Sequence, residues 1–198
     1  LDLYALPYNP EEPVLCFDEK SKELHDDARP VKQAQLSRVR RRDYEYVRKG
    51  TQNIFVTVEP TGGYRTVCVT KRRARSDFAY EMRRLITLSR YRNAKKIHMV
   101  LDNLNTHNQT SLFETFGTET AERIMKKIVF HHTPKHASWL NMAEIEIGVV
   151  SRQAIRGRIG TVEKLKKQIT AWQKRRNRVR ATINWRWTTK DARKKFRY

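Results

Sequence analysis

Two aspartates stand where catalytic acids are commonly found. Asp18 and Asp102 each close an apolar run, in VLCFDE and in KKIHMVLD. Such runs are typical of buried strands, and site residues of α/β proteins gather at strand ends. If the two strands are neighbours, the carboxylates repel each other unless a cation lies between them. We therefore expect Mg²⁺ there, with Mn²⁺ able to substitute, because hard ions prefer carboxylate oxygen. Taken singly, each aspartate is equally typical of a turn.

A third candidate acid, Glu144, ends the stretch HTPKHASWLNMAE at 132–144. We predict a helix from about Ser138 to Arg156, which could hold a glutamate over the strand ends. Helical periodicity leaves two glutamates open, because Glu144 lies at the border of the apolar face and Glu146 near its middle. The one not used would be solvated or ion-paired. Three carboxylates that hold two divalent ions can activate a nucleophilic oxygen and stabilise a leaving one.

The charge of the chain indicates the substrate class. Among 198 residues, 42 are Lys or Arg and 21 are Asp or Glu, a net charge of +21. Such an excess favours a polyanionic partner, and nucleic acid binds by releasing counterions from its phosphates. Metal-dependent phosphodiester chemistry on double-stranded DNA follows as the leading hypothesis. A basic surface protein of the ribosomal type is the alternative.

Two basic segments, RVRRRDYEYVRK at 38–49 and KRRNRVR at 174–180, predict DNA contacts. Arginine mixed with tyrosine suits a surface that follows a nucleic-acid backbone, and such contacts do not read sequence. A solvated basic loop is the alternative for each segment. The candidate DNA-binding residues are Arg40, Arg41, Arg42, Arg48, Lys49, His107, Lys135, His136, Arg175 and Arg176.

The elements that must position these residues form an α/β pattern, a mixed sheet flanked by helices. A long basic connection that carries a short strand and turns at Gly50 is expected at 20–50, and Thr61-Gly62-Gly63 predicts a hairpin turn. Ser76 is a predicted helix N-cap, and a further helix is predicted to start at Thr161. The predicted strands are 14–19, 53–60, 64–71, 95–102 and 127–132, and the helices begin near 76, 109, 138 and 161, with a break near Gly117.

Several other features favour structural interpretations. The histidines at 131, 132 and 136 lack accompanying cysteines and a zinc-finger spacing, so we do not expect zinc. Cys16 and Cys68 lie in apolar runs typical of buried thiols in a reducing compartment. Trp139 is predicted to be a core anchor, and Glu19 to be a surface residue or a neighbour of the site. No 18-residue apolar run exists, so no membrane span is expected.

Five motifs together resemble a known family. They are VLCFDEKS around Asp18, YVRKGTQNIF at 46–55, VLDNLNTH at 100–107, HTPKHASWLNMAE at 132–144 and WRWTTKDARKKF at 185–196. They resemble the DDE catalytic domain of mariner-superfamily transposases, in the bacterial insertion-sequence branch. The resemblance implies a ribonuclease H-like fold with Asp18, Asp102 and Glu144 as metal-binding catalytic acids. It is this resemblance that favours Glu144 over Glu146.

The same resemblance implies Mg²⁺-dependent cleavage at element ends, then attack of the freed 3′-hydroxyl on target DNA. It also implies a homodimer at work in the bacterial nucleoid, within the cytoplasm. A metal-dependent nuclease without strand transfer and a truncated, inactive DNA-binding remnant remain open as alternatives.

The expected domains are a catalytic domain at 1–175 and a basic tail at 176–198 that packs on it or extends it. The chain begins at Leu1, and only 17 residues precede Asp18. We therefore expect a fragment without the family's helix-turn-helix region, which a separate polypeptide could supply.

Overall fold

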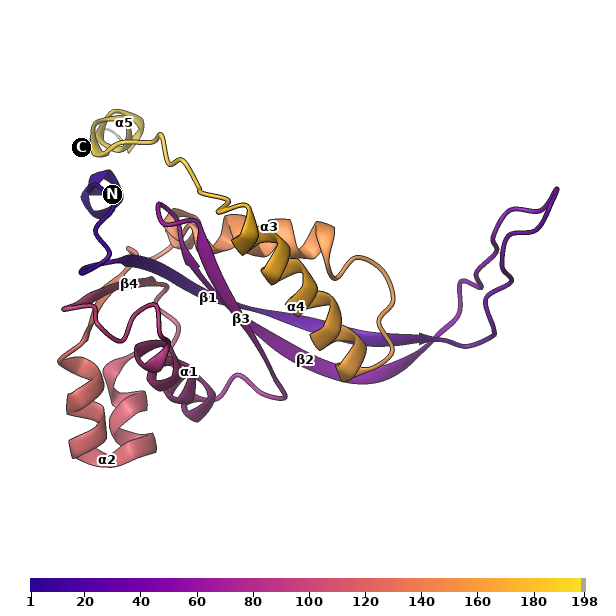
Figure 1. Ribbon diagram of the computed structural model, residues 1–198, viewed down its shortest axis with the longest axis horizontal. Coiled ribbons are helices and arrows are strands. Elements are labelled where there is room, and N and C mark those ends of the chain that lie inside the picture. The colour runs from indigo at the N-terminus through magenta and orange to yellow at the C-terminus, as the bar shows by residue number, and fades with distance from the viewer. Residues whose placement is uncertain (197–198) are drawn as a thin grey trace.

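The computed structural model describes residues 1–196 and shows one mixed sheet between two layers of helices (Figure 1). The strand order is β3-β2-β1-β4-β5. β1 pairs antiparallel with β2 and parallel with β4, β2 pairs antiparallel with β3, and β4 pairs parallel with β5. The predicted fold class is thereby confirmed. The strands are β1 Val14–Asp27, β2 Tyr46–Glu59, β3 Tyr64–Thr70, β4 Ile97–Leu101 and β5 Ile128–His132.

Each face of the sheet buries its own apolar cluster. Phe17 and Phe55 pack with α1 and α2 on one face, whereas Ile54 and Val56 pack with α3 and α4 on the other. Successive residues of a strand point to opposite faces, which is why neighbours such as Ile54 and Phe55 serve different layers. The helices are η1 Asp2–Ala5, α1 Arg75–Thr87, α2 Gln109–Met125, η2 Ser138–Leu140, α3 Ala143–Gln153, α4 Val162–Arg178 and α5 Thr189–Phe196.

The predicted long connection at 20–50 is wrong, because β1 continues to Asp27 and β2 already begins at Tyr46. The two strands stay paired as an arm, defined here as residues 22–52, that projects from the body (Figure 1). Most of its side chains are exposed. Leu24 is its one buried side chain among the described residues, and a ribbon that is otherwise mostly exposed needs no apolar alternation, so its sequence carries no strand signal.

Predicted helix boundaries hold where a side-chain cap or a glycine sets them. The helix predicted to start at Thr161 is α4, and Thr161 is its N-cap, because its hydroxyl accepts a hydrogen bond from the backbone N–H of Lys164 at 3.2 Å. Gly117 has a φ of 72° and interrupts α2, as expected. Only glycine adopts this backbone conformation at low cost, so the break could be placed from the sequence.

Two boundary predictions are wrong. Helix α1 begins at Arg75, so Ser76 is not its N-cap; the Asp77 carboxylate instead accepts from the N–H of Ala74 at 2.8 Å. The single helix predicted from Ser138 is divided into η2 and α3. Asn141 separates them with an extended backbone, φ −79° and ψ 113°.

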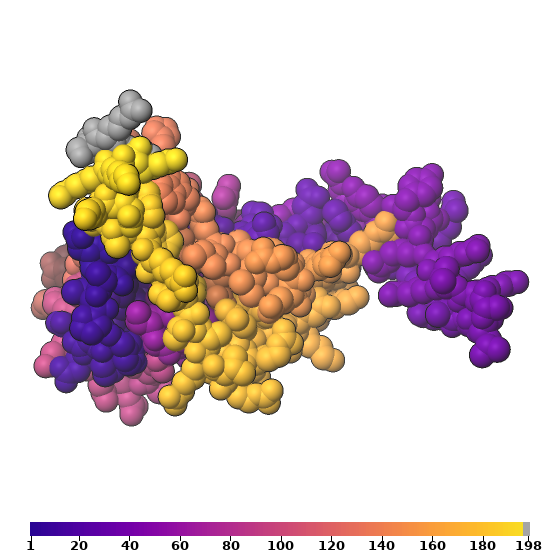
Figure 2. Space-filling model, turned by 90° about the horizontal axis from the view of Figure 1, so that it is seen from above, coloured from indigo at the N-terminus to yellow at the C-terminus, as the bar shows by residue number. Residues whose placement is uncertain are grey.

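The C-terminal segment returns to the N-terminal one. The rings of Trp185 and Tyr4 lie 5.6 Å apart, and Figure 2 shows the yellow segment against the indigo residues. Helix α4 runs to Arg178 and therefore crosses the position after residue 175 where the domain boundary is expected. The division into a catalytic domain and a basic tail stays a prediction. Trp139 is 42% exposed and packs on Trp187, which corrects its expected core position. Within residues 1–196, no helix has the length and apolar character needed to cross a membrane.

Candidate active site

Strand pairing sets Asp18 beside Asp102. In the parallel β1–β4 pair, Cys16 lies opposite Val100. Continuing that register by two residues on each strand, 16 + 2 and 100 + 2, brings residue 18 opposite residue 102. Asp18 lies within β1, and Asp102 directly follows the last residue of β4. The strands expected to be neighbours are therefore neighbours, and their acids share one edge of the sheet.

The first turn of α3 brings Glu144 to the same place. Cys16 packs with Met142 and Ala143 at the start of this helix, so the face of β1 that carries Cys16 and Asp18 lies under α3. Glu144 is exposed. An open cleft contains all three predicted acids, and its lining residues are Asp18, Glu19, Lys20, Asp102, Ser138, Glu144, Ile147, Gly148, Ser151 and Arg152.

The two aspartates differ in how their charge is compensated. Burial raises the pKa of Asp18 to about 7, and the neighbouring carboxylates of Asp102 and Glu19 act in the same direction. Partial burial would also raise the pKa of Asp102, but the hydrogen bond from His107 outweighs it and holds that pKa below its usual value. The charge of Asp102 is thus compensated by the hydrogen bond from His107, whereas that of Asp18 is not compensated to the same degree.

His107 lies behind the aspartates, in a chain of three charged groups. Its Nδ1 is 2.6 Å from Asp102 Oδ1, and its Nε2 is 2.9 Å from Glu19 Oε2. Burial by itself lowers the pKa of His107, but the two carboxylates outweigh it and raise the pKa to about 9. The imidazole is therefore charged near neutral pH, and both nitrogens donate.

The prediction that His107 contacts DNA is corrected. Its side chain is 1% exposed, and its ring packs against Phe17 and Phe78, with centroids 5.2 Å away in each case. A DNA backbone cannot reach a ring enclosed in this way. The histidine instead orients Asp102, and Glu19, 4% exposed, is its buried partner.

Glu146 points away from the cleft into a buried charge network. Its Oε1 lies 3.0 Å from Arg65 Nε, and both side chains are 0% exposed. Arg176 donates to both oxygens of the same carboxylate, at 3.2 and 3.1 Å. This pairing removes Arg176 from the DNA-binding candidates. The burial of Arg65 was not predicted from the sequence, although strand alternation places it on the same face of β3 as Val67 and Val69.

The remaining DNA-binding candidates occupy three surfaces. Arg40, Arg41, Arg48 and Lys49 are exposed on the arm, where Arg42 also pairs with Asp27 at 2.8 Å. Lys135 and His136 are exposed in the loop between β5 and η2, and Arg175 is exposed on the outer side of α4.

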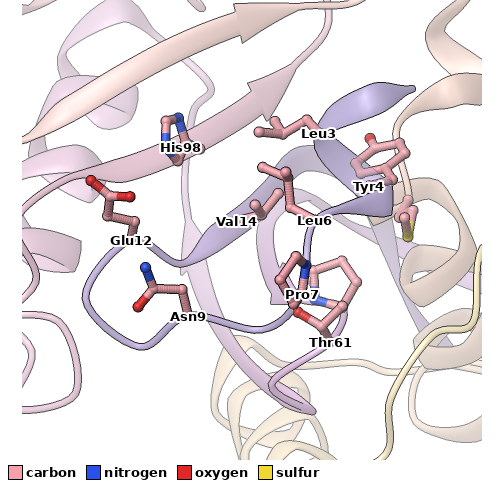
Figure 3. Close-up of a pocket in the computed structure, with 11 residues that line it drawn as sticks. Leu3, Tyr4, Leu6, Pro7, Asn9, Glu12, Val14, Thr61 and His98 are labelled. Carbon is pink, nitrogen blue, oxygen red and sulfur yellow. The ribbon is translucent and has the colours of Figure 1, made fainter.

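A second cavity, of about 180 Å³, lies under the N-terminal segment (Figure 3). Figure 3 shows Leu3, Leu6 and Val14 around it, with His98 and Glu12 to one side. None of the three predicted acids lines it. The acidic cleft is therefore the candidate active site.

The carboxylates suit a hard divalent cation, although they are not closed around one. In the part of the chain that the structure describes, no three His, Cys, Asp or Glu side chains are near enough to hold a metal as they stand. The donor set is oxygen only. Burial and the nearby carboxylates of Asp102 and Glu19 raise the pKa of Asp18, and a bound cation would counter them by favouring its charged form. Mg²⁺ keeps several waters and needs few protein ligands, so the residues fit it.

The family follows from a comparison with protein-family models. The model for the DDE superfamily endonuclease matches residues 13–166, which include all three acids of the cleft. The chain belongs to the DDE superfamily endonuclease family. A comparison of the chain with curated proteins found no match.

Solved structures with a similar fold were also found for this DDE endonuclease. The Mos1 mariner paired-end complex with Mn is 15% identical, with a TM-score of 0.53 over 86% of this chain and 51% of that chain. The Mos1 transposase paired-end complex with left transposon end is 17% identical, with a TM-score of 0.49, and covers 82% and 48%. The chain thus spans about half the length of these proteins. The first likeness shows the fold, which is ribonuclease H-like. The family match confirms the DDE part of the sequence resemblance, and the mariner branch stays a prediction.

Proposed function

We propose that this chain is the catalytic domain of a transposase that cuts DNA at element ends and joins the freed 3′ end to a target. One observation carries the proposal: three carboxylates from β1, the end of β4 and the first turn of α3 line one open cleft in a chain of net charge +21. Membership of an endonuclease family supports DNA cleavage. Strand transfer and the bacterial insertion-sequence branch rest on the sequence motifs.

Asp18, Asp102 and Glu144 are the residues that would hold Mg²⁺, or Mn²⁺ in its place. When bound, the ions supply an activated water and neutralise charge on the phosphate that is being cleaved. His107 holds Asp102 in one orientation from behind, and Glu19 holds His107. Lys20 and Arg152 line the same cleft, where a cation can bind a DNA phosphate.

DNA would lie across the basic surfaces around this cleft. Arg40, Arg48 and Lys49 on the arm, together with Lys135 and Arg175, offer exposed cations to the phosphates of a duplex. Such contacts position DNA without reading its sequence. Recognition of the element ends then falls to a helix-turn-helix segment or a separate polypeptide. Pairing of two ends favours a homodimer, acting in the bacterial nucleoid.

The test supplies DNA that carries the element's ends, a target duplex and Mg²⁺. Cleavage followed by a joined product supports the proposal, whereas cleavage without joining indicates a nuclease. Absence of both, even with an added DNA-binding partner, would leave a DNA-binding remnant. Replacing Asp18, Asp102 or Glu144 by Ala should slow cleavage by about 10²-fold or more and leave salt-sensitive DNA binding intact.

The third acid needs a separate comparison because α3 carries two glutamates. Cleavage that survives in Glu144→Ala but disappears in a folded Glu146→Ala protein would overturn the assignment of Glu144. Glu114 on α2 provides a matched control, since it is an exposed glutamate that pairs with Arg75, and neither residue lines the cleft. Glu114→Ala is expected to cut at the wild-type rate.

A further inference from the structure

Asn141 is a completely buried amide in the loop directly before α3. Its exposed fraction is 0%, and its extended backbone is what divides η2 from α3. A buried amide that lacks hydrogen bonds is costly, so its partners show what holds it in place.

The side chain of Asn141 bonds two different elements. Its Nδ2 donates to the carbonyl of Phe17 in β1 at 2.7 Å, and its Oδ1 accepts from the N–H of Ala143 in α3 at 3.1 Å. Phe17 directly precedes Asp18, and Ala143 directly precedes Glu144. One amide group therefore joins the backbone next to one acid to the backbone next to another.

The main chain of Asn141 adds a third connection. Its carbonyl accepts from the N–H of Glu144 itself at 3.1 Å. The loop before it is held as well, because the hydroxyl of Tyr4 donates to the carbonyl of Leu140 at 2.8 Å. The start of α3 is thus fixed against β1 at the level of the cleft.

Helix capping alone does not explain an asparagine here. An N-cap side chain needs only an acceptor for a free backbone N–H, and Ser, Thr or Asp would serve. The bond to Phe17 requires a separate donor atom on the same short side chain, which the amide of asparagine supplies and a single hydroxyl or a carboxylate does not. Glutamine has both as well, but it is one methylene longer and would displace one of the two partners.

We propose that Asn141 is a positioning residue that sets Glu144 over Asp18 and Asp102 by joining β1 to the first turn of α3. The inference rests on the proposed function, in which these three acids hold the divalent ions. A shift of α3 relative to β1 would widen the gap between the acids while leaving each of them in place on its own element.

The test replaces Asn141 by Leu, which has a similar size and makes no hydrogen bond. Asn177→Leu is the matched control, because the Asn177 amide also makes a pair of bonds: it donates to the carbonyl of Arg65 at 2.8 Å and accepts from its N–H at 2.9 Å. That pair joins α4 to β3, and neither residue lines the cleft. Mn²⁺ affinity is measured for each purified protein from the electron paramagnetic resonance signal of unbound Mn²⁺.

Asn141→Leu should weaken Mn²⁺ binding about 10-fold to 100-fold, the range for losing a residue that orients metal ligands. Asn177→Leu should leave the affinity unchanged. Wild-type affinity in Asn141→Leu would overturn the proposal, and so would an equal loss in Asn177→Leu, because the effect would then reflect general loosening of the fold.

Hydrogen exchange of the backbone amides at 142–146 gives a readout that needs no metal. Exchange there should be faster in Asn141→Leu than in the wild type, and intermediate in Asn141→Gln, which also serves if the leucine variant does not fold. If the wild-type protein binds no Mn²⁺, the proposed function is wrong in assigning a divalent ion to Asp18, Asp102 and Glu144. The exchange data still decide the positioning role, and unchanged exchange overturns it.

Discussion

The two glutamates of α3 have the same chemistry and opposite surroundings. Glu144 is exposed and lines the cleft with Asp18 and Asp102. Glu146 is 0% exposed and is held by Arg65 and Arg176. Two positions along a helix correspond to a rotation of about 200°, so the two side chains cannot share a face. The helix therefore presents one carboxylate to the cleft and the other to the core.

The difference teaches that a charged group that is buried and compensated by partners is no longer available to bind a ligand. A carboxylate in the core persists only when cations and hydrogen bonds compensate it, and Arg65 and Arg176 leave Glu146 nothing to offer a ligand. Glu144 keeps its charge available because water solvates it. A helical wheel predicts which glutamate is buried, and for that reason it favours the one that cannot act.

The largest expected effect concerns stability. Glu146→Ala leaves Arg65 buried without its carboxylate partner, so the free energy of unfolding should fall by about 3–5 kcal/mol. Glu144→Ala removes an exposed side chain and should change it by less than about 0.5 kcal/mol. Urea denaturation followed by circular dichroism measures both. Equal losses in the two variants would remove the distinction between the buried and the exposed glutamate.

The converse effect concerns cleavage. Glu144→Ala removes a proposed metal ligand, and single-turnover cleavage in Mg²⁺ should slow by about 10²- to 10³-fold, or about 2.7–4 kcal/mol of transition-state stabilisation. Glu114→Ala is the control and should cut normally. A Glu144→Ala protein that cuts at the wild-type rate would show that the exposed glutamate has no catalytic role.

Metal binding should stabilise the folded chain through the open acids. Mn²⁺ at 100 times its dissociation constant should raise the free energy of unfolding of the wild type by about 2.7 kcal/mol, because the unfolded chain lacks the site. Glu144→Ala and Asp18→Ala should lose most of this increase. Urea denaturation with and without Mn²⁺ measures it, and an undiminished increase in both variants would locate the ion elsewhere.

The smallest expected effect concerns two arginines of the arm, one without a carboxylate partner among residues 1–196 and one that is ion-paired. Arg40 is exposed on the arm, so Arg40→Ala should reduce the slope of log affinity against log salt by about 0.9 for duplex DNA. Arg29 pairs with Asp43 and Glu45 on the same arm, and Arg29→Ala should change the slope less. Fluorescence anisotropy with a labelled duplex measures both slopes. Identical slopes for wild type and Arg40→Ala would exclude this part of the arm from DNA binding.

Prediction from the sequence succeeded where burial leaves a pattern. Apolar runs located the five strands, and the position of Gly117 located the break in α2. It failed along the arm, where most side chains are exposed and the strand segments at 22–27 and 46–52 have no apolar alternation. It also failed at Asn141, because helical periodicity continues through a residue whose backbone is extended.

The sequence by itself determined the kinds of residues and their order along the chain. It supplied a basic chain, two aspartates at the ends of apolar strands, and the motifs of the DDE family. It could not determine which side chains lie together, because contacts between distant segments depend on how the layers pack.

The tertiary structure alone decided that His107 is enclosed behind Asp102, that Arg65 and Arg176 neutralise Glu146, and that Asn141 joins β1 to α3. The physical reason is that the environment of a charge, its burial and its partners, is contributed largely by other segments of the chain: Phe17 lies 124 positions from Asn141, and Arg176 lies 30 positions from Glu146.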